Sequence, residues 1–263
     1  MGEVHMNQQE RRIWLIDYLR NESPDLADVG IPGDESAQKD LLRALMNVRP
    51  PKAISDEFLQ IQDTYLTSEA EAAGIVNISD LTHFGRDKRL YLWQGDITTL
   101  RCDAIVNAAN PQMRGCFIPL HKCIDNCIHS KSGIQLRLKM DELMRRQGHD
   151  EPVGSAKISP AYNLPCEYVI HVAGPIVYDE LEDEHIEQLT TCYRTCMEVA
   201  ELYNLTSIAF CCISTGEYHF PRDEAARIAT DTVRKYLNEH SSDIKVIFNV
   251  FSDEDLELYT HLL

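Results

Sequence analysis

Three side chains that often bind transition metals lie within eight positions of one another in the stretch GCFIPLHKCIDNCIH. They are Cys116, His121 and Cys123. Thiolates and imidazoles are preferred ligands of Zn²⁺, which takes four protein ligands in structural sites and typically three in catalytic sites. Cys127 and His129 follow directly, and either side chain could supply a fourth ligand. We predict an open three-ligand site, with a closed structural site or no metal at all as the alternatives.

Small and polar residues follow three runs that are predicted to be strands. Asp96 in QGDIT can accept a hydrogen bond from an exocyclic amine such as that of adenine. Asn107 and Asn110 in VNAAN can donate to sugar hydroxyls. Ser214 and Gly216 in STGEYHFP expose N–H groups that can hold a diphosphate. Each motif by itself is also typical of an ordinary turn or helix cap.

Short β-prone runs alternate with helical patterns after Arg86, and these elements would position the polar residues. The runs are RLYLWQGDITTL, CDAIVNAAN, SAKISPAYNLP, EYVIHVAG, TSIAFCCIS and IKVIFNV, each bounded by turn residues. The helical patterns lie at about 125–147, 185–204, 222–239 and 253–262. This alternation predicts a sheet covered by helices on both faces. Ligands of such sheets sit at the carboxyl ends of the strands.

Residues 1–85 show helical patterns without a chemical constellation. Leu42 and Leu45 fall on one face of a pattern that ends at two prolines, which cannot continue a helix. Ser55 precedes a further pattern and can cap its start. We therefore predict a small helical N-terminal extension over residues 1–85, acting as a subdomain or docking arm, and a second domain over residues 86–263.

The charge balance excludes some classes of partner. The chain has 42 acidic and 25 basic residues, which gives a formal net charge of −17. Such a chain repels phosphate backbones, so we predict no nucleic-acid partner. No apolar run approaches the roughly 18 residues of a membrane span, and the N-terminal MGEVHMNQQERR lacks the apolar core of a signal peptide. We therefore predict a cytoplasmic protein with no membrane partner.

Several of the cysteines and two of the histidines are interpreted as structural. Nine cysteines, an odd number without a secretory signal, predict reduced thiols rather than a disulfide framework. Cysteines in apolar or helical patterns behave as small buried hydrophobes, and we interpret Cys192, Cys196, Cys211 and Cys212 in this way. His129 is interpreted as a helix residue and His171, in VIHVAGP, as a buried core histidine.

The order and spacing of several segments resemble the macrodomain family over about residues 88–263. The segments are LWQGDITTLRCDAIVNAAN, DNCIHSKSG, YVIHVAGP and ISTGEYHFP. The resemblance implies a macrodomain-like three-layer α/β/α fold with a mixed central sheet. It also implies binding of ADP-ribose, and the MacroD-type members of the family hydrolyse ADP-ribose from modified proteins.

The resemblance assigns site residues position by position. Asp96 and Ile97 match the positions that grip adenine, and Asn110 matches the asparagine at the distal ribose. Asp125 in IDNCIH matches the aspartate of the MacroD-type loop VDGAIH. The remaining implied contacts of ADP-ribose are Cys123, Ile124, Ser214, Thr215, Gly216, Glu217 and Tyr218.

The cysteine-rich loop departs from the typical MacroD-type pattern, which has a run of glycines there. The departure resembles a zinc-containing subclass found beside sirtuin-like ADP-ribosyltransferases, and the helical extension fits that subclass. The resemblance implies Zn²⁺ as the cofactor, held by Cys116, His121 and Cys123. It also implies a mono-ADP-ribosylated protein as the substrate, such as a glycine-cleavage H-like lipoyl carrier modified on an acidic side chain. We expect the protein to be a monomer.

These assignments predict metal-assisted hydrolysis of the bond between ADP-ribose and a protein side chain. Asn110 would orient the distal ribose, and Asp125 would act as general base or hold the attacking water. The metal would position the sugar or activate a water. One alternative is a non-catalytic reader of ADP-ribose, which needs neither the cysteine-rich loop nor Asp125. Another is a structural zinc domain that acts as an adaptor.

Overall fold

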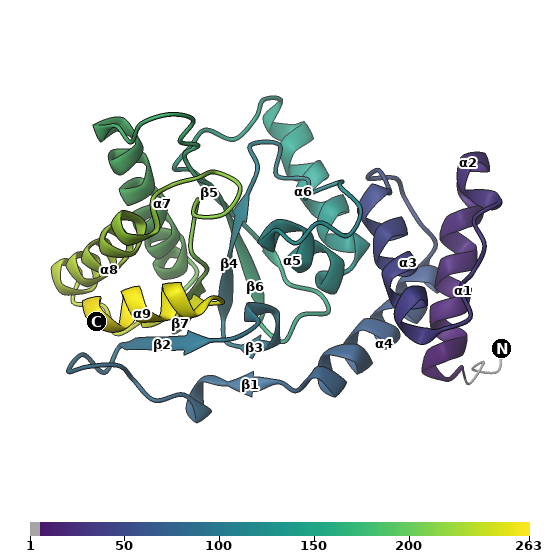
Figure 1. Cartoon of the computed structure of the whole chain (residues 1–263), viewed down its shortest axis with the longest axis horizontal. Coiled ribbons are helices and arrows are strands. Elements are labelled where there is room, and N and C mark those ends of the chain that lie inside the picture. Colours follow the sequence, from purple (N-terminus) through teal and green to yellow (C-terminus); the bar gives the residue numbers. More distant parts are fainter. Residues whose placement is uncertain (1–5) are drawn as a thin grey trace.

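A mixed sheet forms the centre of the molecule in the computed structural model, which describes residues 6–263. Figure 1 shows helices on both faces of this sheet and a further group of helices beside it. The six strands follow the order β2-β8-β7-β4-β6-β5. β5 runs antiparallel to β6, and the other neighbours are parallel. Their bounds are β2 (Leu90–Gln94), β4 (Ala104–Ala109), β5 (Ala156–Pro160), β6 (Tyr168–Ala173), β7 (Ser207–Phe210) and β8 (Lys245–Val250).

Two groups of helices cover the sheet, as the alternation of strands and helices predicts. α5 (Ile124–Ser132) and α6 (Ile134–Gln147) cover one face. α7 (Asp183–Leu202), α8 (Arg222–Glu239) and α9 (Asp253–Leu262) cover the other face (Figure 1). The arrangement confirms the predicted three-layer α/β/α class with a mixed central sheet.

The central strands are apolar along nearly their whole length because helices cover both faces. β4 reads AIVNAA and β6 reads YVIHVA, and most of their residues are buried. Asn107 and His171 are the polar residues of these two strands, and they lie directly opposite each other in the register. Because a buried polar group without a partner is costly, this pair needs hydrogen bonds inside the sheet.

The predicted continuous helix over residues 125–147 is two helices in the structure. Gly133 separates α5 from α6 with φ of +99° and ψ of 170°, a backbone conformation that favours glycine. The broken helix is supported from outside, because the Gln62 side chain accepts a hydrogen bond from the Ile134 amide at 3.0 Å. Because of this break, α5 is a short helix. Both of its ends lie at the carboxyl edge of the parallel strands.

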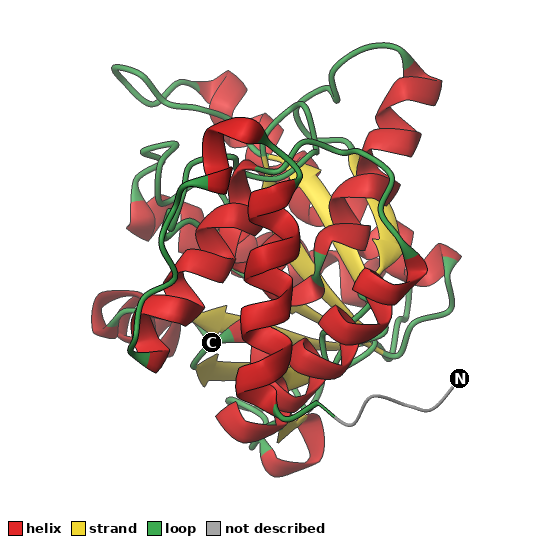
Figure 2. Ribbon diagram, turned by 90° about the vertical axis from the view of Figure 1, so that its right-hand side faces the viewer, coloured by secondary structure: helices red, strands yellow, loops and turns green. Residues whose placement is uncertain are grey.

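Between residues 6 and 75 of the N-terminal extension, four α-helices pack around a hydrophobic cluster of their own. They are α1 (Gln8–Asn21), α2 (Pro24–Ala27), α3 (Glu35–Val48) and α4 (Asp56–Ala73). Leu15, Leu42, Leu45 and Phe58 are buried in this cluster, and Ser55 caps α4 as predicted. Ile134 of α6 also belongs to the cluster, which ties the extension to the sheet domain. Figure 2 shows these helices standing in front of the strands.

A short second sheet also connects the two parts of the chain. β1 (Val76–Asn77) pairs in parallel with β3 (Leu100–Arg101). Residues before 86 thus contact the segment after β2, and the proposed division between residues 85 and 86 stays a prediction. No helix within residues 6–263 combines the length and the apolar character that crossing a bilayer requires.

Candidate active site

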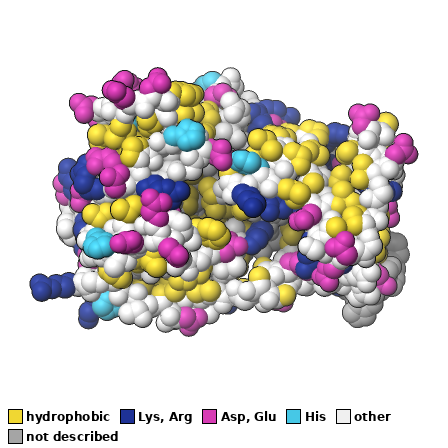
Figure 3. All heavy atoms as spheres, in the orientation of Figure 1, with side chains coloured by type: hydrophobic (Ala, Val, Ile, Leu, Met, Phe, Trp, Pro, Cys, Tyr) yellow, Lys and Arg dark blue, Asp and Glu magenta, His cyan; other side chains and the backbone are white. Residues whose placement is uncertain are grey.

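The topology places three of the predicted ligand-binding segments at one edge of the sheet. β2, β8, β7, β4 and β6 are parallel to one another, so their carboxyl ends point the same way. Asp96 follows β2, Asn110 follows β4, and the segment 211–221 follows β7. Figure 3 shows acidic side chains distributed over one face of the molecule rather than gathered in a single patch. An anionic ligand at this edge would therefore depend on local donors.

The predicted metal ligands come together in space. One ligand atom from each of Cys116, His121 and Cys123 lies within 4.8 Å of the others, and all three residues are half-buried. Cys116 Sγ and His121 Nδ1 are 3.7 Å apart. Neither Cys127 nor His129 belongs to this group among the described residues. We call the segment 110–123, which carries the three side chains, the Cys/His loop.

His121 also links the Cys/His loop to the segment after β7. Its Nδ1 faces Cys116, whereas its Nε2 lies 3.5 Å from a carboxylate oxygen of Glu217. A carboxylate beside the second ring nitrogen is the arrangement that usually fixes the tautomer and orientation of a metal-binding histidine. Glu217 is largely exposed, so the contact contributes orientation more than stability.

The start of α5 holds Asp125 against β4. Cys123 is the N-cap residue of this helix, and its sulfur accepts a hydrogen bond from the Asn126 amide at 3.4 Å. The Asn107 amide group donates to one Asp125 oxygen at 2.7 Å, and the Asn110 amide group lies 3.4 Å from the other. The carboxyl group is therefore held between two asparagines, two residues after a predicted metal ligand.

Burial changes the proton affinity of Asp125. The side chain is almost completely buried, and desolvation raises the pKa of its carboxyl group to about 6. The hydrogen bond from Asn107 and the charge of Arg137 act in the opposite direction. A carboxyl group with a pKa near the working pH can both accept and return a proton. Asp125 thus binds a proton more readily than an exposed aspartate does.

Two buried histidines complete the polar cluster behind Asp125. His171 accepts a hydrogen bond from the Asn107 amide group at 3.1 Å through Nδ1, so its Nε2–H donates to Ser159 Oγ at 3.0 Å. Burial lowers the pKa of His171 to about 3, and desolvation also lowers the pKa of His129. His171 is a core histidine with both ring nitrogens paired, as we predicted, and it orients Asn107. Asn107, which the sequence suggested as a donor to sugar hydroxyls, is instead fully buried in β4 and donates to Asp125 and His171.

The loop after β7 presents unpaired backbone donors. Within residues 6–263, the N–H groups of Thr215, Gly216, Glu217 and Tyr218 donate to no protein acceptor. Ser214 has φ of +64°, and a left-handed residue in such a loop turns successive N–H groups toward one side. The carbonyl of Tyr218 accepts from the Val177 amide at 2.9 Å, which fixes the far end of the loop. These donors suit an anionic ligand such as a diphosphate.

Asp96 has a partner that the sequence analysis missed. One carboxylate oxygen accepts from the Thr98 amide at 3.0 Å, and the other lies 2.6 Å from Lys131 Nζ at the end of α5. Burial raises the pKa of Asp96, but the hydrogen bonds from Lys131 and Thr98 outweigh it, so the pKa is lowered overall. Ile97 is 2% exposed, and its side chain belongs to the hydrophobic core.

The remaining predicted contact, Ile124, is half-buried at the first position of α5. The structure thus gathers the predicted residues in two groups. The Cys/His loop, Asn110 and Asp125 form one group around the start of α5, and residues 214–218 form the other group, joined to the first by the contact between His121 and Glu217. Asp96 stands at the opposite end of α5, beside Lys131.

Comparison with known proteins agrees with this geometry. Residues 106–229 match the family model described as Macro domain. A protein of Treponema medium named "Protein-ADP-ribose hydrolase" is 51% identical over 260 residues, which cover 98% of this chain and 100% of the relative. A Fusarium oxysporum protein named "Probable bifunctional ADP-ribose hydrolase/ADP-ribosyltransferase" is 39% identical over 241 residues, covering 85% of this chain and 40% of the relative.

A solved structure shows the same fold. The Trypanosoma brucei macrodomain in complex with ADP-ribose has a TM-score of 0.65 and 27% sequence identity, covering 83% of this chain and 94% of that chain. The sheet order, the segments at its carboxyl edge and the high identity to a relative of matching length all point to one conclusion. The chain belongs to the macrodomain family.

Proposed function

We propose that this protein is a hydrolase that removes mono-ADP-ribose from modified proteins. The observation that carries the proposal is the position of Asp125, a buried carboxyl group with a pKa of about 6, between two asparagines and beside the Cys/His loop. The relative from Treponema medium bears the name of this activity and matches the chain from end to end. A module that only binds ADP-ribose would need neither the carboxyl group nor the loop.

The binding of the nucleotide follows from the two groups of residues. Asp96 would accept a hydrogen bond from the adenine amine while Lys131 and Thr98 hold its carboxylate. The unpaired N–H groups of residues 215–218 would bind the diphosphate. Interactions with these remote parts of the ligand would fix the distal ribose beside Asn110 and Asp125, which is a proximity effect.

Asp125 and the asparagines would carry the proton transfer. Asn107 holds one oxygen of Asp125 in place, which leaves the second oxygen, near Asn110, to hold a water and accept its proton. Asn110 Oδ1 is buried and without a protein partner within residues 6–263, so it can accept a hydrogen bond from a ribose hydroxyl. The attacking water and the sugar would then be oriented by neighbouring groups.

The Cys/His loop fits Zn²⁺. Bond lengths of about 2.3 Å to sulfur and 2.0 Å to nitrogen in a tetrahedron would place S and N ligand atoms about 3.5 Å apart, and Cys116 Sγ and His121 Nδ1 are 3.7 Å apart. Cys123 supplies the third ligand atom within 4.8 Å. A Zn²⁺ held by these three side chains would supply a Lewis acid with one position free for an oxygen ligand.

The substrate protein and its modification are part of the same proposal. The Cys/His loop and the helical extension resemble the zinc-containing subclass linked to sirtuin-like transferases, and the name of the Fusarium relative joins a hydrolase to a transferase. We therefore propose a glycine-cleavage H-like lipoyl carrier, modified on an acidic side chain, as the substrate. The nine free cysteines support a reducing, cytoplasmic location.

Single-turnover hydrolysis of a mono-ADP-ribosylated carrier protein tests the proposal. Wild type should release ADP-ribose, whereas Asp125→Ala and Cys123→Ala should release it at least about 100 times more slowly, because a positioned base alone contributes about 10²–10⁴-fold. Wild type that binds ADP-ribose tightly but releases none would identify a reader instead. Zinc measured on the same samples tests the ligand set, and full activity of a metal-free Cys123→Ala protein would remove zinc from the mechanism.

A further inference from the structure

Arg43 of α3 reaches out of the N-terminal extension to the Cys/His loop. Its Nη2 donates to the His121 carbonyl at 2.8 Å and to Asn126 Oδ1 at 2.8 Å. Asn126 is fully buried, and its own amide group donates to the Ile118 carbonyl at 2.9 Å. The guanidinium group therefore holds the backbone after the exposed tip of the loop directly and the backbone before it through Asn126. The backbone N–H of Asn126 also donates to the sulfur of Cys123.

Asn47, one turn further along α3, holds the tip itself. Its Oδ1 accepts a hydrogen bond from the Leu120 amide at 3.0 Å, and its Nδ2 donates to Ser130 Oγ at 2.9 Å. Asn47 is 1% exposed, so these bonds are shielded from water. Leu120 has φ of +56°, a left-handed conformation that costs a residue with a side chain about 1–2 kcal/mol. The tip thus needs support from outside the loop.

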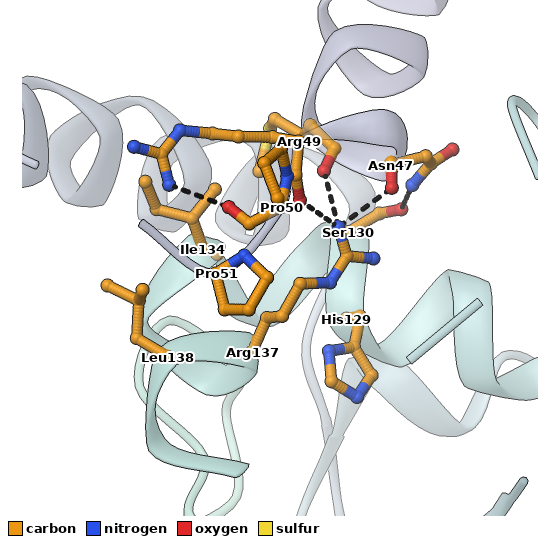
Figure 4. A pocket seen from close by; sticks show the side chains of 11 residues that line it. Asn47, Arg49, Pro50, Pro51, His129, Ser130, Ile134, Arg137 and Leu138 are labelled. Carbon is orange, nitrogen blue, oxygen red and sulfur yellow. Dashed lines mark hydrogen bonds between the residues drawn. The ribbon is translucent and has the colours of Figure 1, made fainter. Parts of the chain in front are cut away.

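Arg137 of α6 joins the end of α3 to the beginning of the same loop. Figure 4 shows its guanidinium group directed at carbonyl groups at the end of α3; the acceptors there are the carbonyls of Met46, Asn47 and Arg49, at 3.1, 2.7 and 2.7 Å. A cation is favoured at this end of a helix. The same group donates to the carbonyls of Arg114 and Cys116 at 2.8 and 3.1 Å, and it lies 4.0 Å from the ring centroid of Phe117.

We propose that α3 is a positioning element of the metal site, so that the extension does more than serve as a subdomain or docking arm. Its side chains bond to the His121 carbonyl and the Leu120 amide, and it reaches Cys116 through Arg137 and the Cys123 sulfur through Asn126. The segment that matches the macrodomain family model begins at residue 106, so this support comes from outside the matched segment. The inference rests on the metal site proposed above. Partners that orient metal ligands typically contribute about 10–100-fold in metal affinity.

Zinc affinity of two full-length arginine variants tests this role. Arg43→Met removes the contacts to the loop, whereas Arg12→Met removes a more deeply buried arginine of the same helical group, whose hydrogen bonds to Gln38 and Glu35 stay within that group. Competition with a chromophoric chelator should show at least about tenfold weaker zinc binding for Arg43→Met and wild-type affinity for Arg12→Met. The Co²⁺-substituted Arg43→Met protein should show an altered thiolate-to-metal absorption band.

Further measurements separate positioning from general stability. ADP-ribose affinity of the chelator-treated proteins should be the same for wild type and Arg43→Met, because the donors at residues 215–218 do not contact α3. Arg43→Lys keeps one donor and the charge, should fold where Arg43→Met does not, and should recover part of the zinc affinity. Unchanged zinc affinity in both Arg43 variants, or an equal loss in Arg12→Met, would overturn the proposed role of α3. Wild type without zinc would instead overturn the metal site, and this inference with it.

Discussion

The two loops that meet at His121 and Glu217 are built in opposite ways. Side chains from α3, α5 and α6 hold the Cys/His loop at the carbonyls of residues 114, 116, 118 and 121 and at the amide of residue 120. The loop after β7 keeps the N–H groups of residues 215–218 without protein acceptors within the described part of the chain. The first loop is held by the protein, and the second is left open for a ligand.

The difference follows from what each loop would bind. Three ligand atoms must stand at fixed distances before a small cation arrives, because a loose set would lose affinity to conformational entropy. An anion such as diphosphate is bound by N–H groups that must remain free. The Cys/His loop, with its fixed side chains, and the loop after β7, with its free N–H groups, lie at the same sheet edge. Together they suit a ligand in which a diphosphate lies near a sugar.

Among the changes that test this difference between the two loops, the removal of His121 should have the largest effect. His121→Ala deletes a predicted ligand and also the contact with Glu217, so we expect zinc affinity to fall by about 100-fold or more. Glu217→Gln breaks only the ion pair with an exposed partner and should change zinc affinity a few-fold at most. Chelator competition on both variants gives the comparison. Equal losses of zinc affinity in the two variants would mean that His121 supplies the contact between the loops rather than a metal ligand.

The polar cluster behind Asp125 should make the free energy of unfolding fall at acidic pH. His171 is neutral in the fold with a pKa of about 3, whereas in the unfolded chain its pKa is about 6.5. The unfolded state therefore gains protons first, and the stability contributed above pH 6.5 is lost as the pH falls toward 3. Between pH 7 and pH 5 this single group should lower the free energy of unfolding by about 2 kcal/mol.

Urea unfolding at both pH values measures this change. His171→Asn should lose less stability between pH 7 and pH 5 than wild type does, although it starts from a lower stability because the pairing with Ser159 is gone. The same pH slope in both proteins would show that His171 does not remain neutral in the fold.

Overpacking beneath the loop after β7 should weaken nucleotide binding. A Cβ atom on Gly174 would lie 2.2 Å from Ser214 Oγ and 3.0 Å from Ile213 Cγ2. Gly174→Ala should therefore displace the loop and weaken ADP-ribose binding by about tenfold, within the 1–3 kcal/mol typical of overpacking. Calorimetric titration measures the affinity. Adding Ser214→Ala, which removes the closest atom, should restore most of it, and Gly30→Ala, where a Cβ has free space, is the control.

The smallest effect is expected at the ion pair of Asp96. Lys131 and Asp96 are 46% and 43% exposed, and exposed ion pairs contribute about 0–1 kcal/mol. Lys131→Ala should thus weaken ADP-ribose binding less than about fivefold, whereas Asp96→Ala, which removes the proposed acceptor for adenine, should have a larger effect. A Lys131 variant that binds as weakly as the Asp96 variant would assign Lys131 a direct contact with the nucleotide.

Much of the fold could be predicted from the sequence because its signals are local. Apolar runs such as AIVNAA, bounded by turn residues, predict buried strands, and the Pro-Pro pair after α3 marks a helix end. The continuous helix over residues 125–147 was wrong, because the periodicity crosses Gly133 without interruption. The break depends on a left-handed backbone and on Gln62 from a distant helix, neither of which a local pattern contains.

The sequence by itself determined which side chains can do chemistry here, because C-x₄-H-x-C and the polar strand ends are properties of spacing and residue type. Only the tertiary structure decided what surrounds them. The pKa of Asp125 depends on burial and on Asn107, and the shape of the Cys/His loop depends on Arg43 and Arg137. Arg43, for example, is 78 positions away from the His121 carbonyl to which it donates, so its effect arises only when the chain is folded.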